Sequence, residues 1–195
     1  MWVRRAAIRP IPQYARVPAE MLERVEDALA GDDVGDEKGD ERKLAGAFAR
    51  FERTQPALSS RIAAALAKPA EETALALGYF LSLAVWMAFE ETFGPRLGTV
   101  GEEDVDATAQ SIAFDEELRQ NAADEVIETD DVVAMEQPEV IAFVRDHIDV
   151  AVEANAPSVA IDDVDRIYRL ILVETVALSH AVAPPEHYGK TTFTA

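Results

Sequence analysis

FERTQPAL at residues 51–58 and AMEQPEVI at residues 134–141 decide the organisation of the chain, because the same Gln-Pro pair returns after 82 residues. A residue that precedes proline is biased away from helical backbone angles, and proline itself fits the first turn of a helix. Gln55 and Gln137 therefore each predict a break between two helices. Apolar residues at helical spacing follow both pairs: Leu58, Ile62 and Leu66 after the first, and Ile141, Val144 and Ile148 after the second.

A second apolar segment follows each of these stretches, at 79–93 in the first case and at 167–181 in the second. The recurring order of acidic helix, Gln-Pro, amphipathic helix and apolar helix predicts two pseudo-symmetric halves, at 18–95 and 102–183. Apolar residues recur with the helical period along the chain, and no strong alternating strand pattern is present. We therefore expect an all-α bundle of about six or seven helices that forms one helical domain at 18–183.

Extended segments are expected at both ends of this domain. Residues 1–17 carry four arginines and no acid, and Pro10 and Pro12 interrupt any continuous helix or secretory signal there. The tail at 184–195 begins with two prolines and is rich in threonine. The apolar residues of the N-terminal arm predict that it docks on the protein. Docking on a neighbouring subunit would produce a homo-oligomer.

The longest uncharged run of the chain, at 73–89, has 17 residues. A helical membrane span needs about 20 apolar residues, usually with basic or aromatic anchors at its ends. Acids flank this run on both sides, with Glu71 and Glu72 before it and Glu90 and Glu91 after it. We therefore expect a buried central helix rather than a membrane span. The absence of cysteine fits a reducing compartment, so the expected location is the cytoplasm.

Acidic residues are concentrated in the second half of the chain. The formal net charge is −19, of which residues 1–17 contribute +4, residues 18–101 contribute −6 and residues 102–195 contribute −17. Within 102–165, 20 acids stand against only two arginines. Such a surface repels nucleic acid and anionic lipid, so we do not expect direct nucleic-acid binding by this part of the protein.

Two interpretations of this acidity stay open. One is solubility or adaptation to salt, which the scarcity of lysine also fits. The other is an acidic face that binds a basic protein, as an inhibitor, an immunity protein or an assembly adaptor would. The candidate partner-binding residues form three clusters of acids: Asp115, Glu116 and Glu117; Asp130 and Asp131; and Asp162, Asp163 and Asp165.

Patterns typical of enzymes and metal sites are sparse. Cysteine is absent, which excludes thiolate sites, and only three histidines occur. Helical dimetal sites use Glu-x-x-His pairs, and the sequence contains none. Ser179 and His180 are adjacent, so on a helix they point about 100° apart and do not pair easily as nucleophile and base. The glycine-rich loop at 31–40 lacks the spacing of a calcium loop. His147 lies between acids on an amphipathic helix and is expected at the surface.

Glu174 is the unusual acid, because it stands inside the apolar run at 167–181. We expect it to contact Arg166, Arg169 or Tyr168, or to point to solvent. Taken together, these patterns predict a non-enzymatic protein-binding or scaffold protein without catalytic, cofactor-binding or metal-binding residues. The alternative is a helical-bundle enzyme or metal-binding protein that uses its carboxylates.

Overall fold

The structure, a computed structural model, describes residues 7–30, 37–67, 72–120, 128–155, 160–186 and 188, without the side chains of residues 30 and 37–41. The described residues form an all-α fold and contain no β-strand, as the sequence predicts. Its helices are α1 (Ala19–Ala30), α2 (Glu37–Thr54), α3 (Pro56–Leu66), α4 (Glu72–Phe93), α5 (Glu102–Gln120), α6 (Thr129–Glu136), α7 (Pro138–Asn155) and α8 (Ile161–Ala181).

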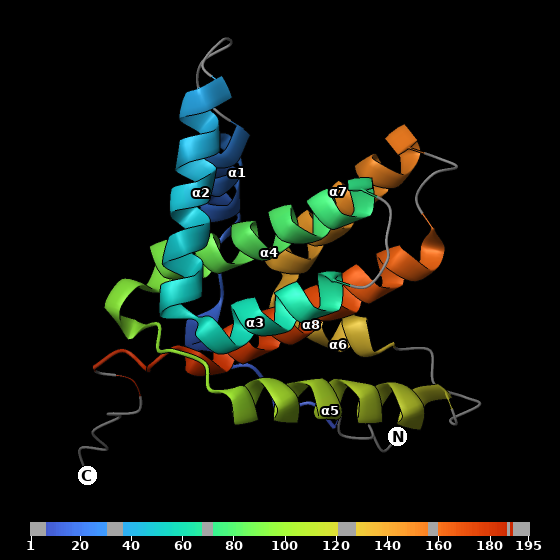
Figure 1. Ribbon diagram of the computed structural model, residues 1–195. Coiled ribbons are helices and arrows are strands. Elements are labelled where there is room, and N and C mark those ends of the chain that lie inside the picture. The colour runs from blue at the N-terminus through green and yellow to red at the C-terminus, as the bar shows by residue number, and fades with distance from the viewer. Residues whose placement is uncertain are drawn as a thin grey trace.

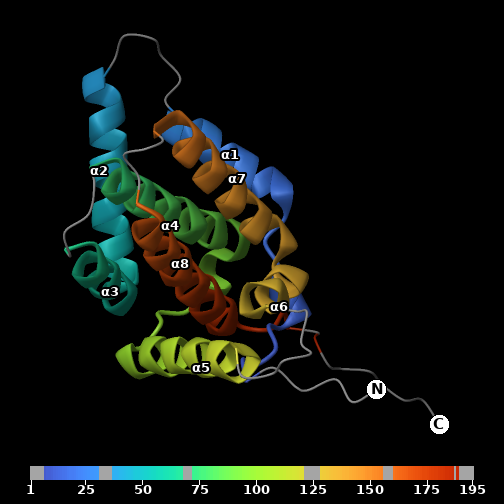
Figure 2. The ribbon, with the colours of Figure 1, turned by 90° about the vertical axis from the view of Figure 1, so that its right-hand side faces the viewer.

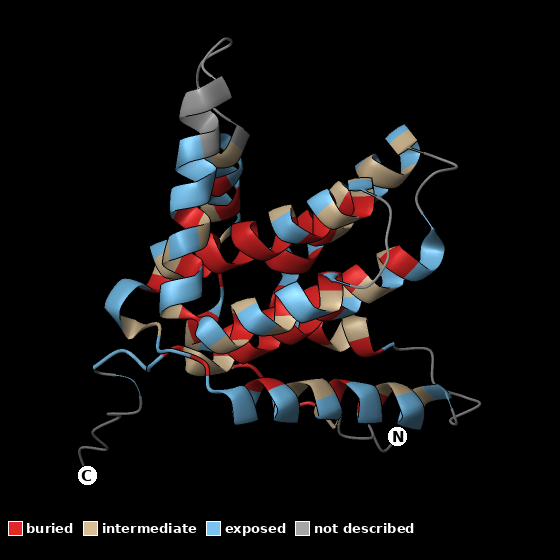
Figure 3. Ribbon diagram, in the orientation of Figure 1, coloured by how far each residue is buried: buried red, intermediate tan, exposed pale blue. Residues whose placement is uncertain are grey.

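The core is built around α4 and α8, which lie next to each other at the centre of the bundle (Figure 1). Both helices are buried along most of their length (Figure 3). By length and composition α4 could cross a membrane, yet 67% of its apolar window is buried inside the protein. Trp86 and Phe89 have no exposed surface at all. The prediction of a buried central helix is therefore confirmed.

The two Gln-Pro pairs have nearly the same backbone geometry. Gln55 has φ −131° and ψ 59°, and Gln137 has φ −129° and ψ 62°, so neither residue is helical. Pro56 and Pro138 then occupy the first positions of α3 and α7, where the missing N–H has no intrahelical partner to lose. Both predicted helix breaks are confirmed.

Each of these glutamines uses its buried side chain to hold an extended segment from the other half of the sequence. Gln55 Nε2 donates to Gly98 O at 2.9 Å, and its Oε1 accepts from Val100 N at 2.8 Å. In the same way, Gln137 Nε2 donates to Ala15 O at 2.6 Å and Oε1 accepts from Val17 N at 3.1 Å. The first segment leads into α5 and the second into α1.

The two helices that follow these held segments, α1 and α5, pack in matching ways. Helix α1 packs on α4 and α7, whereas α5 packs on α8 and α3 (Figure 2). Beyond α4 and α8 the described residues form an antiparallel bridge, in which Gly98 N donates to Ala181 O and Ala183 N donates to Arg96 O. The two-half organisation stays a prediction, and these matched contacts support it.

The bounds of three helices complete the fold. Helix α2 is already helical at Glu37, before Asp40, which is of a residue type that often caps helices. Helix α6 is short and ends at Glu136, directly before Gln137. Helix α5 is described up to Gln120, and residues 121–127 lie outside the described part of the chain.

The N-terminal arm lies on its own chain from residue 7 onward. Ala7 N donates to Asp115 Oδ1 at 2.7 Å, and Ile11 N donates to Glu136 Oε2 at 2.6 Å. Ile8 and Ile11 are buried, so the arm contributes to the core. Residues 1–6 lie outside the described residues, and an oligomer through the arm stays a prediction. Of the tail, residues 184–186 and 188 are described, and the ring of Tyr188 contacts that of Tyr14.

Candidate functional site

Three of the eight acids expected to bind a partner line a cleft between α5, α6 and α8. The cleft has a volume of about 490 Å³ and contains more carboxylates than cations. Its acids are Glu116, Glu128, Asp130 and Asp165, and its other polar side chains are Arg119, Gln120, Thr129, Tyr168 and Arg169. Leu172, which is buried, is the apolar residue of the lining.

Helix α6 presents its acids to the cleft because its N-terminus is fixed by a capping box. The Glu128 side chain accepts a hydrogen bond from the backbone of Asp131, and the Asp131 carboxylate accepts one from Glu128 N at 3.2 Å. This reciprocal pair satisfies backbone groups that a helix start otherwise leaves without partners. The position of Asp130 between these two residues is thereby fixed.

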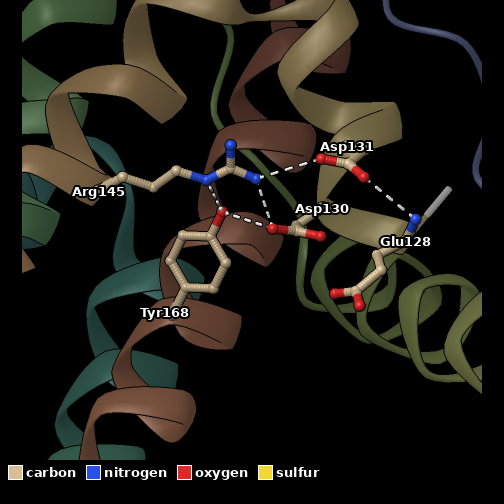
Figure 4. A network of polar contacts seen from close by, with 5 residues as sticks. All are labelled: Glu128, Asp130, Asp131, Arg145 and Tyr168. Carbon is tan, nitrogen blue, oxygen red and sulfur yellow. Dashed lines mark hydrogen bonds and ion pairs between the residues drawn. The ribbon is translucent and has the colours of Figure 1, made fainter. Parts of the chain in front are cut away.

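Asp130 is then held by residues from two other helices (Figure 4). Arg145 Nη2 of α7 donates to Asp130 Oδ2 at 2.6 Å, and the Tyr168 hydroxyl of α8 donates to the same oxygen at 3.1 Å. Arg145 Nε also donates to the Tyr168 oxygen at 3.0 Å. The three side chains form a closed triangle in which the carboxylate accepts and the guanidinium donates twice.

The electrostatics of this triangle keep its tyrosine protonated. Burial raises the pKa of Tyr168 to about 12, and the neighbouring Asp130 carboxylate acts in the same direction, although Arg145 opposes it. The hydrogen bond to Asp130 raises the pKa of the Arg145 guanidinium above its usual value. At neutral pH the tyrosine is therefore a neutral hydrogen-bond donor, because its phenolate form is disfavoured.

Asp115 lies beneath the cleft and is almost completely buried. Its carboxylate accepts from Ala7 N at 2.7 Å, from the Thr129 hydroxyl at 2.9 Å and from Arg119 Nε at 2.5 Å. Burial opposes its charge, but these hydrogen bonds outweigh burial and hold the pKa of Asp115 below its usual range. Asp115 therefore ties the N-terminal arm to α5 and α6 and does not present its charge to solvent.

The remaining candidate acids fall into two groups. Asp131 lies beside the cleft and contacts Arg145 at 3.5 Å, and Asp163 is largely buried against Arg166. Glu117 and Asp162 are exposed and do not line the cleft. Of the eight predicted residues, three line the cleft, namely Glu116, Asp130 and Asp165. Arg145 and Tyr168 were not predicted, although Arg145 is one of only two bases within 102–165.

The expectation for Glu174 was wrong. The side chain is buried between α8 and α4, and neither carboxylate oxygen has a hydrogen-bond partner of good geometry among the described residues. Burial raises the pKa of Glu174 well above its usual value, and the hydroxyl of Ser82 on α4 only partly opposes this effect. Ser82, Trp86 and Thr175 also bury polar atoms without a partner in the described part of the chain.

The environment of His147 also differs from the surface position that was expected. Its side chain is only 24% exposed, and its ring lies 4.1 Å from the ring of Phe143 and 5.2 Å from that of Phe80, centroid to centroid. Nδ1 lies 2.9 Å from Phe143 O. Among the described residues, no group of three or more His, Asp or Glu side chains is arranged to hold a metal ion.

Comparisons with protein-family models, with curated proteins and with solved structures found no match for this chain. The function is therefore argued from the geometry and the charges of its own residues.

Proposed function

We propose that the protein is a non-enzymatic binding protein, of the inhibitor or assembly-adaptor type, whose α5–α6–α8 cleft receives basic side chains of a partner protein. The observation that carries this proposal is the way in which the arginines of α5–α8 are used. Each of the four pairs with an acid of the same chain: Arg119 with Asp115, Arg145 with Asp130, Arg166 with Asp163, and Arg169 with Glu116.

These internal pairs leave the cleft with acids that no cation of the described chain neutralises. Glu128 and Asp165 line the cleft, are exposed, and have no ion-pair partner among the described residues. A lysine or arginine of a partner can pair with them without displacing an internal cation. An arginine is favoured because its planar guanidinium binds carboxylates through two parallel hydrogen bonds.

The fixed positions of the polar groups also favour binding. Because Asp130 and Tyr168 are already hydrogen-bonded, the cleft loses little side-chain freedom when a partner arrives. The long-range attraction between a face of this charge and a basic protein accelerates association and makes it sensitive to salt. On a surface that serves only solubility, the acids of the cleft and the acids elsewhere contribute equally to this attraction.

The experiment compares two variants that remove the same charge. Glu128→Gln with Asp165→Asn neutralises the cleft, and Glu52→Gln with Asp149→Asn neutralises two exposed acids on α2 and α7 away from it. Each protein is immobilised and used to capture proteins from a native lysate at low salt and at roughly 0.5 M salt, where the Debye length is well below 10 Å.

The wild type and the control pair are expected to retain basic proteins at low salt and to lose them at high salt, whereas the cleft variant retains few at either. If the captured proteins carry no excess of positive charge, or if the cleft variant captures as much as the control, the acidity serves solubility only.

A further inference from the structure

A second groove lies between α1 and α7, which run side by side (Figure 2). Its volume is about 450 Å³, within the range of sites that hold side chains of a ligand. Leu22 and Phe143 form its floor, and the small side chains of Ala19 and Ala142 leave it open. Val150, at 67% exposure, adds an apolar contact.

The rim of this groove is acidic. Glu23 and Glu26 of α1 and Glu139 and Asp146 of α7 line it, and its described lining contains no lysine or arginine. Glu26 lies 3.4 Å from His147 Nε2. The other three acids are exposed and have no ion-pair partner among the described residues. An apolar floor between two acidic edges is complementary to a segment that is apolar on one side and basic at its edges.

The protein contains a comparison for this groove. A groove of about 520 Å³ lies between α3 and α5, and α3 begins with Pro56 as α7 begins with Pro138. At this α3–α5 groove Arg61 of α3 pairs with Asp106 of α5 at 2.6 Å, so a cation from the chain itself neutralises one of the two acids of the lining, the other being Glu102.

The corresponding positions of the α1–α7 groove lack this cation. Glu23 stands four residues after the start of α1, as Asp106 does in α5. Phe143 stands five residues after the start of α7, as Arg61 does in α3. The α1–α7 groove therefore has an acid, Glu23, at the position of Asp106, but a phenylalanine, Phe143, at the position of Arg61. An arginine of a partner protein can then pair with Glu23.

We propose that the α1–α7 groove binds a basic amphipathic helix of the partner protein. The apolar side chains of that helix lie over Ala19, Ala142 and Val150, and an arginine or lysine pairs with Glu23 as Arg61 pairs with Asp106. Long cationic side chains suit this position because their stems cover apolar surface while their charges reach the rim. Apolar anchors at i, i+3, i+4 and i+7 are the usual pattern of a helix bound in a groove. The inference rests on the proposed function, because it names the segment of the basic partner that the protein holds.

The test uses a synthetic helical peptide of about 14 residues with leucines at these spacings and arginines on both flanks. Binding to the full-length protein is measured by calorimetry, and the contact surface by backbone amide shifts of labelled protein. A second peptide carries glutamate in place of every arginine. We expect the arginine peptide to shift amides of α1 and α7, and the glutamate peptide not to bind.

Two groove variants and one control make the test specific. Glu23→Gln with Glu139→Gln removes two rim charges, and Ala142→Lys fills the exposed groove with a cation. Each variant is expected to lower the affinity for the arginine peptide by about tenfold. Glu52→Gln with Glu103→Gln removes equal charge on α2 and α5, which do not line the groove, and is expected to leave the affinity within about twofold of wild type. Circular dichroism confirms that all variants keep the wild-type helix content.

The groove inference is overturned if the arginine peptide fails to bind, if the groove variants bind it as the control does, or if the amide shifts lie outside α1 and α7. A failure of the groove inference can be distinguished from a failure of the proposed function. The proposed function is tested separately, by the capture of basic proteins with the cleft variant at low and high salt. If the cleft variant loses basic partners and any of these peptide results is obtained, the groove inference is rejected and the proposed function of the cleft is retained.

Discussion

Gln137 is fully buried and makes three hydrogen bonds with groups distant in the sequence. Its amide binds Ala15 O and Val17 N, and Nε2 also donates to Ser179 Oγ at 2.9 Å. Ser179 in turn donates to Thr175 O, so one side chain joins the arm, the α6–α7 break and α8. A buried glutamine whose donors and acceptor are all used is favourable, whereas the same groups left without partners are costly.

Gln137→Ala should therefore destabilise the protein by about 3 kcal/mol, because it leaves two backbone groups unsatisfied and opens a cavity. Gln55→Ala should have a cost of similar size, since Gln55 makes the matching pair of bonds with Gly98 and Val100. Urea unfolding of each variant measures the change. Gln110→Ala, at an exposed position of α5, is the control, with an expected change within about 0.5 kcal/mol. A Gln137→Ala protein as stable as this control would contradict the account.

Glu174 should give the protein a distinctive dependence of stability on pH. The folded-state pKa is raised above the unfolded value of about 4.3, so the folded state binds this proton more tightly. The contribution of Glu174 is therefore complete below the unfolded pKa and is lost as pH rises through the folded pKa. Glu174→Gln cannot ionise, and its free energy of unfolding relative to wild type should rise with pH above about 4.3.

Denaturant unfolding of both proteins at several pH values between about 4 and 8 provides the measurement. The difference between the two proteins isolates Glu174, because all other titrating groups are shared. A difference that is constant over this range would mean that Glu174 is not held in its protonated form.

At the scale of the elements, α6 depends on its neighbours. It has only eight residues, and a helix of this length is not stable by itself in water. Its capping box fixes one end, and Asp130 connects it to Arg145 of α7 and Tyr168 of α8. The acids of the cleft are thus positioned by contacts between helices more than by the helix itself.

Arg145→Met should loosen α6 selectively, because it removes the cation that holds Asp130 and leaves the stem of the side chain in place. Amide hydrogen exchange in 129–136 is expected to accelerate by about tenfold or more, with little change in α4. Arg166→Met, which removes an ion pair within α8, serves as the matched control. Equal exchange in α6 of both variants would show that the triangle does not hold this helix.

The elements differ in how far the sequence predicts them. Pro56 and Pro138 predict the starts of α3 and α7, because proline restricts the backbone angles of the residue before it and fits the first turn of a helix. The short helix α6 has too few turns to display a period, so its sequence fits a turn equally well. The triangle joins residues that are 15, 23 and 38 positions apart, and no local spacing encodes it. Glu174 was misjudged because a charge inside an apolar run does not reveal whether a cation faces it.

At the scale of the whole molecule, the two predicted halves are interlocked. Gln55 holds the segment that leads into α5, and Gln137 holds the segment that leads into α1. Helices α4 and α8 are buried against each other at the centre. Neither half can complete its core or satisfy these backbone groups without the other.

Fragments 1–96 and 97–195 should therefore fail to fold when produced separately. Each is expected to show low helix content and no cooperative thermal transition, and an equimolar mixture should regain both properties. Circular dichroism and size-exclusion chromatography of the fragments and the mixture provide the measurement. A fragment that melts cooperatively alone would make its half an independent domain.

Photo-crosslinking from within the α5–α6–α8 cleft tests whether this cleft receives a basic protein. A photoreactive amino acid replaces Gln120, which lines the cleft and is exposed, and a second protein carries it at the exposed position of Glu52 on α2. Both are irradiated in native lysate at low salt and at roughly 0.5 M salt. The expectation is that basic proteins crosslink to position 120 alone, and at low salt only. Crosslinks that are equal at both positions, that persist at high salt, or that join neutral or acidic proteins would contradict it.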